Sequence, residues 1–317
     1  MQARGKFASG IGVLICMALM CGCGQFETEE HPQAAPAPPA LQYLGQWGAK
    51  GDGPGQLDQP AGIATDANGN VYIADAGSQF IHKLDPQGTP LLSFQEGALK
   101  HPQWITIDGG GAMYVSDPVR NSVFIFLPDG DKYRELRLKT RANPENMISV
   151  AVGDDGLIHI LDWSAEKVFT YTPSMRLAQN WPPLTGAAGA ASTNHHRGPI
   201  VRGPEDSLYF ADASGGRILR YSRDGQYVSA IDASADGTQR KLSREFAVSN
   251  SCVLAMDADG HTLHVWTLDG KLKLDTDLAA QLGPGSRLPP AIAVSPRSEM
   301  LVLDAPQARV LRYHINF

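Results

Sequence analysis

The sequence predicts an all-β domain built from six similar units, and three observations support this prediction. An apolar strand pattern that ends in aspartate recurs at intervals of 42 to 50 residues, ending at Asp75, Asp117, Asp162, Asp212, Asp257 and Asp304. A branched or apolar residue follows each aspartate by six positions, and leucine or an aromatic residue follows it by nine. In four units a glycine lies thirteen positions after the aspartate, in sequences that suit tight turns.

Each unit reads as four short strands: one beginning about thirteen residues before the aspartate, one ending at it, one starting about six residues after it, and one after the glycine turn. The predicted fourth strands are 91–94, 133–138, 177–181, 227–231 and 272–276. A four-stranded meander that repeats at this interval is typical of a propeller blade. The sequence therefore predicts a six-bladed β-propeller over residues 41–317.

The sixth unit ends near its third strand, so its fourth strand must come from elsewhere. Residues 41–47, LQYLGQW, precede the first blade and have the pattern of a strand. We expect this segment to complete the last blade and to close the ring, which would leave no edge strand at the join.

The N-terminus has the features of an export signal. Arg4 and Lys6 precede an apolar run at 11–20, which is too short for a membrane span of about 20 residues. The sequence LMCGC that follows resembles a bacterial lipobox, with Cys23 as the lipidated residue. We expect residues 1–22 to be a lipoprotein signal peptide and 23–40 to be the lipidated cysteine with a Pro/Ala-rich tether. The alternative is an ordinary cleaved signal with chance cysteines.

The composition indicates where the protein is located and which classes of partner it binds. Gly24, and not aspartate, follows Cys23, so for a Gram-negative source the resemblance favours the periplasmic side of the outer membrane. The formal charge of -6 argues against nucleic-acid binding, which depends on Lys and Arg contacts to phosphate. After cleavage only Cys23 and Cys252 remain; with Cys23 lipidated, no disulfide is expected. Cys252 is then interpreted as a small buried hydrophobe.

Residues 59–88, QPAGIATDANGNVYIADAGSQFIHKLDPQG, resemble an NHL repeat through their GIA-x-D, G-N-x-Y-I-A-D and I-x-x-L elements. Residues 99–130 are similar to a second such repeat, and the resemblance weakens in the third, fifth and sixth units. It implies a propeller but no particular activity, because members and six-bladed relatives include sensor domains, scaffolds, lyases and calcium-dependent lactonases. No enzyme subgroup motif matches here.

The repeated aspartates are interpreted as building devices that accept backbone N–H groups in the following loops. Positions that differ between repeats are better candidates for a binding site. We expect the start of each first strand and the loop after each aspartate to surround one mouth of the channel. The candidate ligand-binding residues there are His101, Trp104, Asn146, Trp163, His195, His196 and Lys241.

Other interpretations of these residues stay open. They also suit a solvated loop rim, and Trp104 and Trp163 suit a core that plugs the channel. His195 and His196 with His101 suggest zinc or copper, and Asn143, Glu145, Asn146 and Asp58 suggest calcium, but neither pattern has the spacing of a known metal motif, so no metal site or cofactor is assigned. Trp47, Trp181 and Trp266 are expected to be structural. Arg202 is expected to pair with a carboxylate such as Glu205.

Two functions remain compatible with the sequence. The first is a lipid-anchored envelope propeller that binds a protein, peptide or glycan partner without catalysis. The alternative is a metal-dependent hydrolase or lyase, using calcium or zinc at the channel mouth. An enzyme requires ligands that converge at the channel axis, whereas a scaffold tolerates a plugged channel.

Overall fold

The computed structural model describes residues 40–138, 148–163, 167–181, 198–212, 216–238, 240–282 and 291–316. Residues 38–317 form one compact unit. Within the described ranges no helix is both long and apolar enough to cross a membrane. The described helices are the short α1 (Ala279–Leu282), η1 (Pro204–Asp206) and η2 (Ala305–Gln307).

The described strands form six four-stranded antiparallel sheets. The first three blades are β2 (Pro60–Thr65), β3 (Val71–Asp75), β4 (Phe80–Leu84) and β5 (Pro90–Gln95); β6 (Trp104–Ile107), β7 (Met113–Asp117), β8 (Ser122–Phe126) and β9 (Lys132–Arg137); and β10 (Ile148–Val152), β11 (Ile158–Asp162), β12 (Lys167–Tyr171) and β13 (Leu177–Asn180). The other three are β14 (Ile200–Arg202), β15 (Leu208–Asp212), β16 (Arg217–Tyr221) and β17 (Tyr227–Asp232); β18 (Leu242–Val248), β19 (Cys252–Asp257), β20 (Thr262–Thr267) and β21 (Leu272–Asp277); and β22 (Ala291–Val294), β23 (Glu299–Asp304), β24 (Arg309–Ile315) and β1 (Leu41–Trp47).

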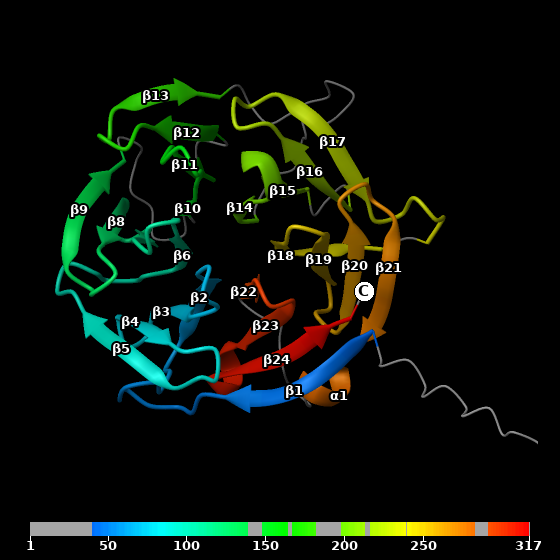
Figure 1. Ribbon diagram of the computed structural model, residues 1–317, viewed down its shortest axis with the longest axis horizontal. Helices are drawn as coiled ribbons and strands as arrows, with labels where there is room; N and C mark the ends of the chain where they lie inside the picture. The colour runs from blue at the N-terminus through cyan, green and yellow to red at the C-terminus, as the bar shows by residue number, and fades with distance from the viewer. Residues whose placement is uncertain are drawn as a thin grey trace, which may run out of the picture. The chain divides into compact units, whose positions relative to one another are not determined.

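The six sheets stand in a ring around a central channel, and the predicted fold class, a six-bladed β-propeller, is confirmed (Figure 1). The first strand of every blade lies nearest the centre, and the last strand lies at the rim. The predicted fourth strands correspond to β5, β9, β13, β17 and β21.

The strand expected to complete the last blade forms β1, which pairs antiparallel with β24 from Leu41 opposite Ile315 to Trp47 opposite Val310. Trp47 also reaches the first blade, where its ring covers Gly88. A Cβ at Gly88 would lie 2.5 Å from that ring, and the backbone φ of 89° favours glycine. The N-terminal strand is thus held by the last blade and the first.

The apolar positions that repeat relative to the aspartates predict the core correctly. All six residues six positions after the aspartates are buried: Ile81, Val123, Val168, Ile218, Leu263 and Val310. Trp181 and Trp266 are fully buried, as expected of structural tryptophans, and Cys252 is a buried free thiol. Neighbouring blades pack through these apolar faces, which fixes the first strands around the channel.

The repeated aspartates act as predicted in several blades. Asp75 accepts the backbone N–H groups of Asp58, Gln59, Gly77 and Ser78 at 2.7 to 3.2 Å. Asp117 and Asp257 accept loop N–H groups in the same manner. Blades four and six add a feature that the repeat pattern did not predict, because Asp212 bonds Arg217 and Asp304 bonds Arg309.

Candidate functional site

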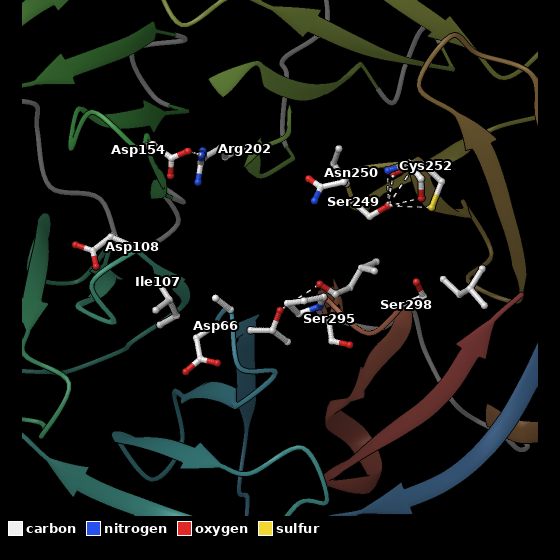
Figure 2. Close-up of a pocket in the computed structure, with 18 residues that line it drawn as sticks. Asp66, Ile107, Asp108, Asp154, Arg202, Ser249, Asn250, Cys252, Ser295 and Ser298 are labelled. Carbon is white, nitrogen blue, oxygen red and sulfur yellow. Dashed lines mark hydrogen bonds and ion pairs between the residues drawn. The ribbon is translucent and has the colours of Figure 1, made fainter. Parts of the chain in front are cut away.

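The candidate site lies where the first strand of each blade turns into the second. These turns meet at one mouth of the channel and enclose a cavity of about 470 Å³ (Figure 2). Its lining includes Asp66, Asp108, Asp154, Arg202, Asn250, Cys252, Ser295 and Ser298. Because strands in a blade are antiparallel, this mouth is at the opposite end of the channel from the loops that follow the repeated aspartates. We call it the turn-side mouth.

Two of the three aspartates at this mouth are engaged in their own turns. Asp66 accepts the backbone N–H groups of Asn68 and Asn70, and its second oxygen accepts the Tyr72 hydroxyl at 3.0 Å. Asp108 bonds its own turn and Tyr114 in the same way. Burial, followed by the Asp108 charge, raises the pKa of Tyr114 to about 12, so this phenol stays a donor. These carboxylates shape the rim and have little capacity left for a ligand.

Arg202 gives the mouth its cation. It occupies the innermost strand of blade four, where other blades carry Thr65, Ile107, Val152 and Val294. The guanidinium bonds Asp206 at 2.7 Å and also pairs with Asp154 of blade three. The expectation that Arg202 pairs with a carboxylate is confirmed, but the residue named as an example was wrong, because Glu205 approaches Arg220 at 3.5 Å instead.

The ion pairs of Arg202 with Asp206 and Asp154 stabilise the ionised form of the Asp206 carboxyl. Partial burial opposes ionisation of Asp206, but the N–H of Asp154 and the Arg202 guanidinium hold the pKa of Asp206 below its usual range. Arg202 therefore stays beside a carboxylate over the physiological pH range while about a third of its side chain remains exposed. That exposed part can donate hydrogen bonds to a ligand.

Blades five and six contribute uncharged polar groups. Ser249 and Ser295 bond the backbone of their own turns. Asn250 and Ser298 have no side-chain hydrogen bond to the described residues, and Asn250 is exposed and directed toward the open centre (Figure 2). Together with Arg202 and the exposed carboxylate of Asp154, they make a mouth whose available groups are one guanidinium, one carboxylate, one amide and one hydroxyl.

Below this mouth the channel holds a second cavity of about 450 Å³ that shares Thr65, Ile107, Arg202 and Asn250 with the first. Its walls are the innermost strands of the blades. An apolar collar surrounds it at equivalent positions, formed by Ile63, Ile105, Val150, Ile200, Phe246 and Ile292. A ligand seated at the mouth therefore has an apolar space beneath it.

The candidate residues predicted from the sequence are only partly brought together. His101 and Lys241 lie at the opposite mouth, where the backbone N–H of His101 bonds Asp117 and the carbonyl of Lys241 accepts from Ala258. Trp163 donates its indole N–H to the Gly198 carbonyl, and Arg244 lies 6.0 Å from its ring centre. Trp104 lines the channel cavity.

Asn146, His195, His196 and Cys23 lie outside the described residues, as do Asn143 and Glu145 of the calcium hypothesis. Within the described ranges, no group of three or more His, Cys, Asp or Glu side chains is placed to hold a metal ion.

Sequence reasoning did not select the turn-side mouth. In blades one and two its residues sit in turns of the D-x-x-G type, which are typical of the scaffold of a repeat. One available signal was Arg202, a charge in a position that is otherwise uncharged. The other was the SNS segment 249–251, where blades one and two have an Asx turn led by Asp66 and Asp108.

Comparison with known proteins supports the fold and leaves the activity open. A family model described as a beta-propeller repeat matches residues 41–74. No curated protein gives a significant sequence match. A solved streptogramin B lyase is similar over 87% of this chain and 87% of its own, with 15% identity and a TM-score of 0.57.

Two further structures show the same architecture. A catalytically inactive virginiamycin B lyase from Staphylococcus aureus with quinupristin has 15% identity over 87% of this chain and 89% of its own, with a TM-score of 0.56. The propeller domain of Cps50 (Swd1) from Myceliophteria thermophila has 10% identity over 87% of this chain and all of its own, with a TM-score of 0.59. A lyase and a domain with no stated catalysis therefore share this fold, so function must be argued from the site.

Proposed function

We propose that this chain is a β-propeller binding module of the cell envelope that holds a peptide or glycan partner at the turn-side mouth. One observation carries the proposal: residues from all six blades enclose a cavity of about 470 Å³ whose available polar groups are Arg202, Asp154, Asn250 and Ser298. A concave site on a rigid scaffold with a few placed polar groups is the usual form of a ligand site. These groups both donate and accept hydrogen bonds, so the partner supplies paired donors and acceptors, as peptide amides and sugar hydroxyls do.

The binding proposal is tested at Arg202. The full chain in detergent is screened against peptide and glycan arrays, and the best ligand is titrated by calorimetry. Arg202→Gln removes the charge and most of the donors at the mouth, so we expect affinity about tenfold lower, in keeping with loss of a charged hydrogen bond. Arg137→Gln, an exposed arginine at the end of the rim strand β9, is the matched control. Equal affinities for both variants would remove the turn-side mouth as the binding site.

We also propose that the module is anchored through a lipid on Cys23, at the periplasmic side of the outer membrane. The support is the sequence alone: a short apolar run followed by LMCGC, and a Pro/Ala-rich segment before the propeller. A diacylated N-terminus provides two or more chains, which is enough for stable attachment.

The anchoring proposal predicts that Cys23→Ser moves the protein from the membrane fraction to the soluble fraction, and that mass spectrometry of the wild type finds a diacylglyceryl adduct on Cys23. Cys21→Ser is the matched control and is expected to stay with the membrane. If Cys21→Ser is released and Cys23→Ser is retained, the assignment of the lipidated residue is wrong.

The alternative, a metal-dependent hydrolase or lyase, shares its fold with the lyases described above. Nothing in the described residues favours it over binding, because the mouth presents no convergent set of metal ligands there. It would regain support from a stoichiometric calcium or zinc ion in the purified full chain, together with a lower melting temperature in chelator.

A further inference from the structure

The turn between β14 and β15 differs from its counterparts at the mouth by one residue type. In blades one, two and three this five-residue turn closes with a bond from its first N–H to its last C=O, and its fourth residue is a glycine with positive φ: Gly69, Gly111 and Gly156. The turn of blade four closes in the same way, but its fourth residue is Asp206, which has a φ of 54°. A side chain is disfavoured in this left-handed conformation. Blade four therefore keeps a carboxylate where glycine would fit without strain.

The Asp206 carboxylate fixes Arg202 across the seam between blades three and four. Its Oδ1 accepts the Arg202 Nε–H at 2.7 Å and the backbone N–H of Asp154 at 3.1 Å. Only 14% of the Asp206 side chain is exposed. The Nη2 group of Arg202 pairs with the Asp154 carboxylate, which lies beside it at the mouth (Figure 2). Arg202 is thus held between two carboxylates.

One side of the guanidinium is left for a ligand. Nη1 has no partner among the described residues, and about a third of the Arg202 side chain is exposed. An anion in contact with the guanidinium would lie about 4 Å from its positive charge and about 6 Å from the negative charge of each carboxylate. Because the Coulomb energy varies as the inverse of the distance, the two repulsions together exceed the attraction. An uncharged oxygen atom accepts the same hydrogen bond without this repulsion.

The other charges at the mouth add to this preference. Asp66 and Asp108 also line the cavity, and their carboxylates are bound to their own turns. Arg202 is the only cationic side chain among the described residues that line it. Two other arginines of blade four, Arg220 and Arg223, are absent from this lining and have carboxylate partners of their own. An anion that enters the cavity therefore meets a surplus of negative charge.

We propose that Asp206 and Asp154 set the ligand specificity of the turn-side mouth: they hold Arg202 so that it donates to an uncharged carbonyl or hydroxyl oxygen of the partner and rejects carboxylate and phosphate groups. This inference rests on the proposed binding function and narrows its ligands to peptide or glycan segments without an acidic group at the mouth. Repulsion of the wrong partner is a usual source of specificity. Asp206 acts on the ligand only through Arg202, so it is a positioning residue.

The test measures how strongly the mouth binds inorganic phosphate. ¹⁵N-labelled full chain in detergent micelles is titrated with phosphate at constant ionic strength, and the N–H resonances of the mouth are followed by NMR. Asp206→Gly introduces the residue that blades one to three carry, so the turn is expected to form. It removes one of the two repelling charges, and we expect phosphate to bind about tenfold more tightly than to the wild type. Adding Arg202→Gln to this variant is expected to abolish the gain.

Glu205→Gly is the matched control. Glu205 occupies the same turn and has a φ of 57°, but its carboxylate is mostly exposed and approaches Arg220 instead of Arg202. The phosphate affinity of this variant is expected to equal that of the wild type. Asp154→Asn provides a second route, because this carboxylate is 71% exposed and the substitution leaves the core unchanged. It is expected to show the same gain as Asp206→Gly, so the inference is tested even where one variant folds poorly.

The peptide and glycan arrays test the same specificity on larger ligands. Each acidic ligand is compared with its neutral counterpart: glutamate with glutamine peptides, and glucuronate with glucose oligosaccharides. We expect every ligand that binds the wild type through Arg202 to be the neutral member of its pair, and the identity of that member distinguishes a peptide from a glycan partner. Wild-type binding of the acidic member with equal or greater affinity would overturn the inference.

Failure of this inference and failure of the binding function give different results. Phosphate that binds the wild type as tightly as Asp206→Gly refutes the specificity and leaves the mouth as a binding site. A gain in Asp206→Gly that persists without the Arg202 guanidinium refutes the positioning role. A gain that depends on Arg202, with no array ligand bound by the wild type, supports the specificity and refutes the proposed binding function.

Discussion

Deletion of residues 41–47 from the full chain is expected to abolish folding at 25 °C or to lower the free energy of unfolding by roughly 5 kcal/mol or more, a large share of the stability of a typical domain. The deletion removes β1, so β24 becomes an edge with a row of unpaired N–H and C=O groups. It also removes Trp47 from the apolar cluster between the last blade and the first. Closure of the ring is lost along with the contacts.

The measurement is urea unfolding followed by circular dichroism and by tryptophan fluorescence. A deletion of equal length at 31–37, which lies outside the described residues, is the matched control and is expected to keep the wild-type midpoint. A midpoint for the 41–47 deletion that equals the control would show that the five complete blades and three strands of the sixth are sufficient. Strand β1 would then contribute nothing measurable to stability.

The fold was predictable because its determinants repeat. Because one pattern occurs six times, a strand that is hard to recognise in one unit is identified from its position in the others. The strand order and the number of blades therefore followed from the spacing of the repeats. The Asp75 contacts were also predictable, since a buried carboxylate at a strand end must find donors and the following loop supplies them. Even the strand at 41–47 followed from counting the strands of the last unit.

The site was less predictable for the opposite reason. A binding site consists of residues that differ from the repeated pattern. One such residue does not reveal which other side chains lie close to it in the fold. Arg202 was visible as an anomaly, but its pairing across blades to Asp154 depends on the ring geometry. Glu245 was visible only because the other five units carry Ile or Val at its position, twelve residues before the aspartate. The slip in pairing that places Phe246 in the collar cannot be inferred from one sequence.

Glu245→Gln is expected to stabilise the protein at neutral pH and to leave it unchanged near pH 4. Burial raises the pKa of Glu245 in the folded state, with Arg244 in partial opposition. Between the unfolded and the folded pKa, the native state binds more protons, so the free energy of unfolding falls as the pH rises through that window. Each unit of the window costs the wild type about 1.4 kcal/mol, and the neutral amide avoids this cost.

The measurement is the difference in unfolding free energy between Glu245→Gln and wild type, followed from pH 4 to pH 8 in urea. Glu205→Gln is the control, because that carboxyl is 86% exposed and makes only a long contact to Arg220. Its difference from wild type is expected to stay within about 0.5 kcal/mol across the range. A difference for Glu245→Gln that is equally flat would mean that Glu245 is ionised and solvated in the native protein.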